Sequence, residues 1–112
     1  MVNKRLNAYR IMWLFVMFDL PTETAAHRKV YAKFRKEIMG NGFNMFQFSI
    51  YVRHCPSRET ADVYKRLLKR LVPDEGIVGV LEITDKQFEK MEIYVGKKRQ
   101  PPASPPQQLT LF

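Results

Sequence analysis

The first residue with clear chemical potential is Asp19, an acidic side chain that follows a long apolar run in residues 11–18. Polar side chains at the carboxyl ends of buried strands lie beside a rigid scaffold, where binding sites often form. A carboxylate in that position holds a divalent cation, or it caps backbone N–H groups at the start of a turn. The residues around Asp19 are compatible with both roles.

Clustered basic residues form the second group with chemical potential. They occur in two segments that are predicted to be helical, residues 22–39 and the segment that begins at Pro56-Ser57. Such clusters are usually solvated helix surfaces, but they also bind the phosphates of nucleic acids. We expect the main phosphate contacts to be among Arg28, Lys29, Lys33, Lys65, Arg66, Lys69 and Arg70.

His54 and Cys55 are adjacent and have no second pair of ligands elsewhere in the sequence, so they fall short of a zinc site and are interpreted as structural. A single cysteine excludes an intrachain disulfide and fits a reducing compartment. The apolar run after the basic residues 1–10 is too short for a membrane span and has no cleavage site of a signal peptide. We therefore expect a cytoplasmic protein.

Length and charge limit the classes of protein to which the chain can belong. The chain has 112 residues, 46% of them hydrophobic and 27% charged, which is typical of one globular domain. Nineteen Lys and Arg against eleven Asp and Glu give a net charge of +8. This charge favours a polyanionic partner, and nucleic acid ranks ahead of an anionic membrane.

Hydrophobic periodicity predicts the elements that position these residues. The run in residues 11–18 indicates a strand that is buried on both faces. Residues 22–39 indicate a helix with Thr22 as its N-cap, because apolar residues recur there at a spacing of four. The expected buried stripe of this helix consists of Ala26, Val30, Phe34 and Ile38.

The pattern in residues 43–53 predicts a strand with one packed face and one hydrogen-bonding face. The second face is an exposed sheet surface, an interface or a nucleic-acid platform. The packed face is expected to carry Phe46, Phe48, Ile50 and Val52, and the other face Gln47, Ser49, Tyr51 and Arg53.

A second helix is predicted to begin after Ser57, its N-cap. A strand in residues 76–84, a helical turn in residues 85–91 and a short strand in residues 92–95 follow. The core stripe of the second helix is expected to consist of Ala61, Tyr64, Leu67, Leu68 and Leu71.

This order predicts an α/β protein, an α+β two-layer sandwich of the ferredoxin-like type. That βαββαβ fold has an antiparallel sheet with two helices on one face, and it requires two strands between the helices. A bend near residues 47–49 would divide the predicted strand of residues 43–53. We expect residues 1–96 to form this domain and residues 97–112 to form a basic, proline-rich tail. The tail ends in Leu109-Thr110-Leu111-Phe112, which either frays or adds as a strand to a partner.

Four motifs in this order give the chain a family resemblance. They are Asp19-Leu20-Pro21 after the apolar strand, the segment from Gln47 to Tyr51, the segment from Arg53 to Glu59, and the segment from Ile83 to Phe88. Over residues 9–96 the chain resembles the small CRISPR-associated protein that joins the integrase subunit in acquiring spacers, the second of the Cas proteins. Members from type II systems look most similar.

The resemblance implies a homodimer in which Asp19 of each protomer faces its mate and the pair binds one Mg²⁺. It implies a magnesium-dependent endonuclease site with Asp19 and Ser49 as catalytic residues. It also implies a scaffold in the CRISPR adaptation complex, which binds double-stranded protospacer DNA and bridges integrase dimers. Relatives with nuclease character have arginines early in the first helix, where His27 and Lys29 lie in this chain.

Two functions are therefore open. One is the adaptation scaffold, with the last strand and the tail as the expected integrase surface. The alternative is a stand-alone, toxin-like ribonuclease that uses the same Asp19 and needs no partner. Binding to the integrase favours the first, and magnesium-dependent RNA cleavage by the purified protein favours the second.

Overall fold

The computed structural model describes residues 11–102. Within them four longer strands and two long helices form the main body, and a short helix and a hairpin follow. The elements are β1 (Met12–Asp19), α2 (Ala25–Gly40), β2 (Asn44–Gln47), β3 (Ile50–Cys55), α3 (Arg58–Leu71), β4 (Ile77–Thr84), α4 (Asp85–Glu89), β5 (Ile93–Val95) and β6 (Lys98–Gln100).

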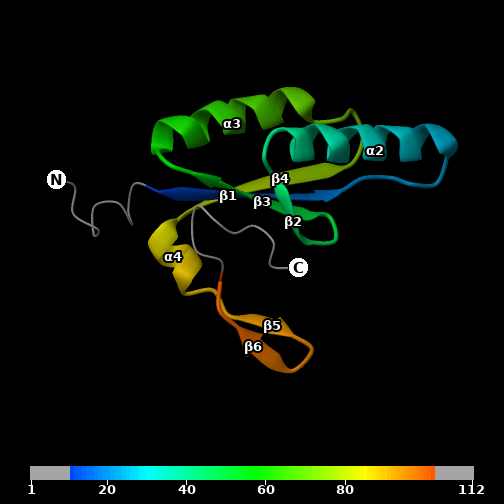
Figure 1. Ribbon diagram of the computed structural model, residues 1–112. Coiled ribbons are helices and arrows are strands. Elements are labelled where there is room, and N and C mark those ends of the chain that lie inside the picture. Colours follow the sequence, from blue (N-terminus) through cyan, green and yellow to red (C-terminus); the bar gives the residue numbers. More distant parts are fainter. Residues whose placement is uncertain (1–10, 103–112) are drawn as a thin grey trace.

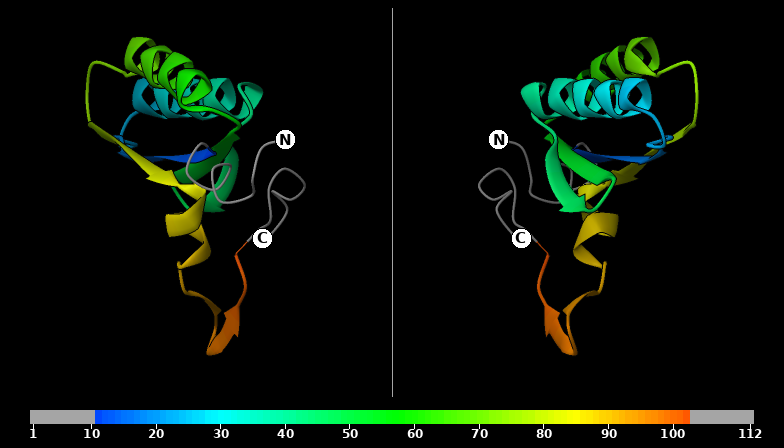
Figure 2. Two further views of the ribbon diagram at one scale, coloured as in Figure 1. Left: turned by 90° about the vertical axis from the view of Figure 1, so that its left-hand side faces the viewer. Right: turned by 90° about the vertical axis from the view of Figure 1, so that its right-hand side faces the viewer.

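The main sheet has the strand order β2-β3-β1-β4, and each neighbouring pair is antiparallel. Helices α2 and α3 lie side by side on one face of this sheet (Figures 1 and 2). The arrangement confirms the predicted ferredoxin-like sandwich. It also confirms the proposed division of residues 43–53, because a turn at Phe48-Ser49 separates β2 from β3.

Strand β1 lies between β3 and β4, and its residues from Met12 to Val16 are buried on both faces of the sheet, which explains its unbroken apolar sequence. Leu14, Val16 and Phe18 belong to the core beneath the two long helices. Trp13 and Phe15 belong to a second apolar cluster on the opposite face. The carboxyl end of a rigid central strand therefore positions the acidic residue that follows.

The prediction for the first helix was wrong in two details. Helix α2 is capped by Thr24, whose side chain accepts a hydrogen bond of 3.0 Å from the His27 backbone N–H, and not by Thr22. Ala26 and Val30 are exposed. A spacing of four residues advances more than one helical turn, so a strict four-residue stripe rotates off the core side. The side that packs consists of Tyr31, Phe34 and Ile38.

The predicted faces of the third segment were also partly wrong. Phe48 lies in the turn and 86% of its surface is exposed, whereas Tyr51 is 1% exposed beneath the helices. The register of β2 against β3 shifts between Met45 and Gln47, and the turn follows, so the two-residue alternation does not continue from β2 into β3. Ile50 and Val52 do share the opposite face with Phe46, as expected.

The second long helix follows the prediction closely. Ser57 caps α3 and accepts a hydrogen bond of 3.1 Å from the Thr60 backbone N–H. Ala61 and Leu68 are buried, and Tyr64 and Leu71 pack against the same core. The alternation of three- and four-residue steps in this stripe keeps it facing the sheet.

Helix α4 covers part of the other face of the sheet, where the Phe88 ring stacks on Trp13 with centroids 4.0 Å apart. After it, β5 and β6 form a separate antiparallel hairpin that projects away from the main body (Figure 1). The predicted boundary between domain and tail falls in the turn of this hairpin, and the predicted docking residues 109–112 lie outside the described residues. No helix within residues 11–102 is long and apolar enough to cross a bilayer.

Candidate functional site

Asp19 is the last residue of β1, and its side chain is exposed beside a hollow at the edge of the body. It pairs with Ile77 of β4 in the sheet register. The hollow has a volume of about 510 Å³ and receives residues from β1, from the start of α2 and from the β2–β3 turn. Its lining consists of Phe18, Asp19, Leu20, Thr22, Arg28, Tyr31, Phe48 and Ser49.

Ser49 reaches this hollow through the geometry of the β2–β3 turn. Its backbone has a positive φ of 64°, which is uncommon for a residue with a side chain. The Phe18 backbone N–H donates a hydrogen bond of 3.0 Å to the Ser49 carbonyl, which fixes the turn against the end of β1. The hydroxyls of Tyr31 and Ser49 lie 3.1 Å apart in hydrogen-bond contact. The structure thus brings both predicted catalytic residues, Asp19 and Ser49, to the same hollow.

Arg28 supplies the positive charge of the hollow. Its Nη1 donates hydrogen bonds of 3.0 Å to the Thr22 carbonyl and 3.3 Å to the Glu23 carbonyl. These two bonds hold the guanidinium over the loop that follows Asp19. An arginine has five N–H donors, so an anchored guanidinium still has donors for an anion.

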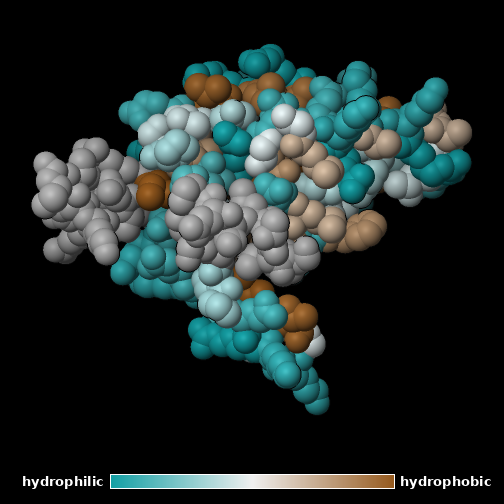
Figure 3. Space-filling view, viewed as in Figure 1, coloured by the Kyte–Doolittle hydropathy of each residue, from teal (hydrophilic) through white to brown (hydrophobic). Residues whose placement is uncertain are grey.

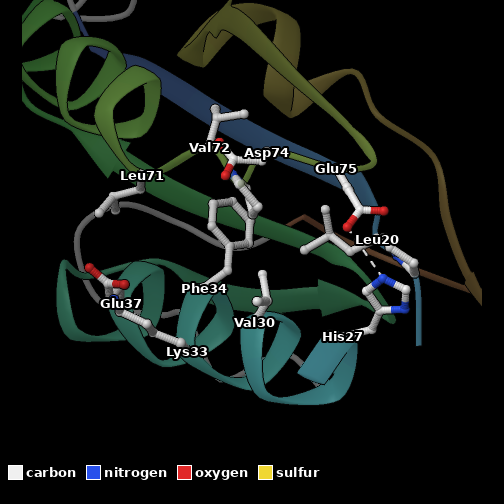
Figure 4. A pocket seen from close by; sticks show the side chains of 12 residues that line it. Leu20, His27, Val30, Lys33, Phe34, Glu37, Leu71, Val72, Asp74 and Glu75 are labelled. Carbon is white, nitrogen blue, oxygen red and sulfur yellow. Dashed lines mark hydrogen bonds and ion pairs between the residues drawn. The ribbon is translucent and has the colours of Figure 1, made fainter. Parts of the chain in front are cut away.

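His27 points in another direction, although it lies next to Arg28 in the sequence. Its Nε2 is 3.3 Å from Glu75 Oε1, and its Nδ1 is 3.9 Å from Glu23 Oε2. It lines a separate pocket of about 360 Å³ between α2 and the loop before β4, whose walls include Phe34, Leu71 and Val72 (Figure 4). Neighbouring residues of a helix point in different directions. Arg28 therefore lines the hollow that contains Asp19, whereas His27 lines the other pocket.

The hollow offers Mg²⁺ one carboxylate per chain. Within residues 11–102 no group of three or more His, Cys, Asp or Glu side chains is arranged to hold a metal ion. Magnesium keeps several water ligands and is often bound through one or two carboxylates. Asp19 is the one carboxylate among the residues that line the hollow, beside the hydroxyl groups of Thr22, Tyr31 and Ser49, and this set would supply a single carboxylate ligand to a largely hydrated Mg²⁺.

Besides Arg28, the predicted phosphate contacts fall into two groups. Lys29, Lys33, Arg66, Lys69 and Arg70 are exposed and form no ion pair with another residue of the described part of the chain. Figure 3 shows hydrophilic side chains over much of the helical layer that carries them. Lys65 is engaged within the protein.

The Lys65 Nζ lies 2.6 Å from Glu82 Oε1 and 3.2 Å from Asp62 Oδ1. The hydrogen bond to Glu82, with a smaller contribution from Asp62, raises the pKa of Lys65. Two carboxylates therefore partly neutralise the positive charge of Lys65, so this residue attracts phosphates less strongly than the unpaired basic residues do.

His54 and Cys55 lie on opposite faces of β3 and do not converge on one point. The His54 ring makes an edge contact with Trp13, with centroids 5.2 Å apart, and burial lowers the pKa of this histidine. Cys55 is buried under the helices, where desolvation raises the pKa of its thiol. A buried thiol with a raised pKa is chemically inert, in accordance with a structural role.

Residues 12–91 match the family model described as CRISPR associated protein Cas2. The chain belongs to this family. A protein of Flavobacterium psychrophilum named CRISPR-associated endoribonuclease Cas2 is 52% identical over 108 residues, which cover 96% of this chain and 94% of that protein. A protein of the same name from Parvibaculum lavamentivorans is 52% identical over 101 residues, covering 90% of this chain and all of that protein.

More distant Cas2 relatives span the same core. A protein of Streptococcus mutans with the same name is 40% identical over 88 residues, covering 79% of this chain and 80% of that protein. The comparisons confirm the family that the four motifs indicated. The similarity to members from type II systems stays a prediction.

Sequence reasoning missed two residues of the hollow. Tyr31 was not singled out, and Phe48 was assigned to the packed face. The direction of a helical side chain depends on where the helix begins, and that of a turn residue depends on the register of the strands. Neither quantity is visible in the pattern of apolar residues.

Proposed function

We propose that this chain is a component of the CRISPR adaptation complex, in which its homodimer binds duplex DNA and positions the integrase subunit. The observation that carries the proposal is the set of unpaired basic residues on α2 and α3 of a Cas2-family domain. Lysine and arginine side chains that lack internal partners are free to neutralise phosphates. Such contacts fix the position of a duplex without reading its sequence, as a scaffold requires.

The open part of the sheet face supports a homodimer. Met17, Ile77 and Leu81 lie on the face opposite the long helices, and they are 37%, 72% and 47% exposed. Apolar residues gathered on one surface favour burial against a partner. A second copy placed there brings its own Asp19 to the site, because Asp19 borders this surface. Twofold symmetry then supplies the second carboxylate that one chain lacks.

The integrase surface is proposed at the end of the domain. The β5–β6 hairpin stands away from the body and exposes Tyr94 and Val95 beside Lys97, Lys98 and Arg99. Its second strand, β6, already belongs to the predicted tail of residues 97–112. Deletion of residues 107–112 tests whether the tail contributes to assembly with the integrase. Unchanged assembly would show that these residues are not part of the integrase surface.

A magnesium-dependent endonuclease is the second candidate function, and the names of the relatives favour it. When bound, Mg²⁺ polarises a phosphate and lowers the pKa of a coordinated water. The residues of this chain that would hold it are Asp19 and its counterpart in the second copy. Arg28 is placed to bind a phosphate oxygen, and the Ser49 hydroxyl, held by Tyr31, orients the same group. The stand-alone ribonuclease remains the alternative to the adaptation role.

Spacer integration with the cognate integrase tests the proposal. The wild type is compared with Asp19→Ala, after size measurement and circular dichroism have shown that the variant folds and dimerises. Integration that persists identifies the chain as a DNA scaffold in adaptation. Integration that disappears while assembly survives shows that the Asp19 site takes part in adaptation itself. Failure of the wild type to bind the integrase, together with magnesium-dependent RNA cleavage, would favour the stand-alone ribonuclease.

A further inference from the structure

The pocket of about 360 Å³ between α2 and the loop before β4 has no role in the functions proposed above. Its lining includes Leu20 and Phe34, which belong to the core beneath the long helices. Two valines also line it, Val30 of α2 and Val72 of the loop, and they are 46% and 44% exposed. Figure 4 shows these valines on opposite sides of the Phe34 ring. An apolar group of a partner that fills the pocket would remove both valines from water.

The charged residues of the pocket are mainly acidic, in contrast to the net charge of +8 of the whole chain. Three carboxylates line the pocket, those of Glu37, Asp74 and Glu75, against one lysine, Lys33. Glu37 and Asp74 form no ion pair with another residue of the part that the structure describes. Unpaired carboxylates repel phosphates and attract Lys and Arg side chains. The pocket is therefore complementary to a basic protein segment and not to nucleic acid.

The walls of the pocket are held in place within one chain. His27 Nε2 lies 3.3 Å from Glu75 Oε1, and this contact joins α2 to the loop (Figure 4). The ring of Pro73 restricts the backbone of the same loop. The loop ends at Gly76, which lies so close to the end of β1 that a Cβ there would meet the Asp19 carbonyl. A preformed pocket binds a partner without the entropic cost of ordering its walls.

We propose that this pocket is a protein-docking site, whose occupant is an apolar side chain flanked by Lys or Arg in the integrase subunit. The inference rests on the proposed adaptation function, and it adds a contact to the one proposed at the β5–β6 hairpin. Leu20 and Phe34 place the pocket on the helix side of the sheet, opposite the proposed dimer surface. A homodimer therefore keeps two equivalent pockets open, one for each of the two integrase units that it bridges.

The affinity of the full chain for its purified cognate integrase, measured by biolayer interferometry without DNA, tests the proposal. Val30→Glu places a carboxylate on the apolar wall, and Asp74→Lys reverses one of the charges. Val63→Glu and Glu59→Lys are the matched controls, because both residues are exposed on α3 and neither lines the pocket. Circular dichroism verifies that each variant folds.

We expect Val30→Glu to weaken integrase binding by roughly 10- to 100-fold, as for the loss of an interface hot spot. Asp74→Lys is expected to weaken binding by about 3- to 10-fold, because it sets a cation against the basic segment. The two controls should change the affinity by less than about 2-fold, since they lie outside the contact. Unchanged affinity in Val30→Glu, or an equal loss in Val63→Glu, overturns the proposal.

Photo-crosslinking identifies the occupant independently of these variants. Val72→Cys carries a benzophenone maleimide at the pocket, and Val63→Cys carries the same label elsewhere on the surface. The native Cys55 is buried, so the label reacts with the introduced thiol. We expect a crosslink from position 72, and not from position 63, to an integrase segment with an apolar residue beside Lys or Arg. A crosslink between two copies of this chain, or none to the integrase, overturns the proposal.

Two outcomes separate this inference from its premise. A wild type that does not bind the integrase contradicts the adaptation function itself. A wild type that binds, together with a Val30→Glu variant that binds equally well, contradicts only the docking site. Light scattering adds a further check, because loss of dimer mass in Val30→Glu would assign the pocket to the homodimer interface and overturn the proposal.

Discussion

The indole N–H of Trp13 donates a buried hydrogen bond of 2.7 Å to Asp85 Oδ1. The bond joins the first residues of the central strand to the first residue of α4, and the Asp85 backbone N–H extends the connection with a bond of 2.9 Å to the Ile11 carbonyl. Phe88, one turn later, stacks on the same indole. Polar and aromatic contacts with Trp13, together with the backbone bond to Ile11, therefore hold α4 against the sheet.

Asp85→Ala is expected to reduce the free energy of unfolding by about 1–3 kcal/mol, because it leaves a buried indole N–H without an acceptor. Urea denaturation of the purified protein measures the change. Glu89→Ala is the control, since it removes an exposed carboxylate from the same helix. Equal losses in the two variants would show that the Trp13 bond is not the cause.

His54 is expected to make the protein less stable in mild acid. Burial lowers the pKa of His54 from its ordinary value of 6.5, with a smaller lowering from Arg53 and an opposing effect of Asp85. The unfolded chain then binds more protons than the folded chain, so stability is fully present above pH 6.5 and falls as the pH drops towards the folded-state pKa. Thermal unfolding from pH ~7.5 to pH ~5 should show a smaller loss for His54→Phe than for the wild type. A steeper loss in the variant contradicts the assignment.

Gly76→Ala is expected to destabilise the protein and to disturb the site. Gly76 has a φ of +96°, and a Cβ there would meet the Asp19 carbonyl at 2.6 Å and Leu20 Cδ2 at 2.7 Å. A loss of about 1–3 kcal/mol is expected for this strained backbone and close contact. Gly40→Ala is the control, because a Cβ at Gly40 meets nothing within 4 Å and the residue ends α2. Denaturation midpoints of both variants, with nuclease or integration assays, check the prediction.

Lys69 and Lys65 are expected to differ in their effect on duplex DNA binding. Removal of an unpaired cation that contacts phosphate lowers the slope of log affinity against log salt by about 0.9. Lys69→Ala should produce this change, whereas Lys65→Ala should produce less because Glu82 and Asp62 already hold Lys65. Titrations at several salt concentrations measure both slopes. A larger effect at Lys65 would show that its ion pairs open on binding.

Ile77→Glu is expected to weaken the proposed homodimer, since it places a charge in the open apolar part of the sheet. A fully desolvated, unpaired carboxylate at an interface costs several kcal/mol, so dissociation should appear at micromolar concentrations. Val63→Glu is the matched control, because Val63 is 50% exposed on α3, away from the sheet face. Light scattering of both variants gives the result, and an unaffected Ile77→Glu dimer places the interface elsewhere.

The parts of the fold that were predictable are those where the local pattern carries the tertiary information. The apolar run of β1 identified a strand with two covered faces, and Ser57 before a helical stripe identified the start of α3. Asp19 followed from its place after that strand. In each case a few neighbouring residues decide the structure.

The prediction errors occurred where the direction of a side chain depends on how the strands pair, which the local sequence does not show. Ser49 adopts a positive φ without being glycine, so the sharp turn lacked its usual sequence signal. Beyond this turn Tyr51 faces the helices, where the Arg35 Nε donates a hydrogen bond of 2.7 Å to its hydroxyl. Whether Arg28 or His27 lines the hollow depends on the residue at which α2 begins, and Thr24 determines that residue by capping the helix.

The bond from the Phe18 N–H to the Ser49 carbonyl has a consequence for the lifetime of the site. Phe18 is buried in the central strand, and its amide is opened to solvent only when the β2–β3 turn separates from β1. Its hydrogen-exchange rate therefore reports how often Asp19 and Ser49 come apart. Exchange at the rate of the core amides means that the two residues separate only when the whole domain unfolds. Faster exchange at Phe18 alone means that the turn opens independently of the rest of the domain, and the exchange rate then measures how often it opens.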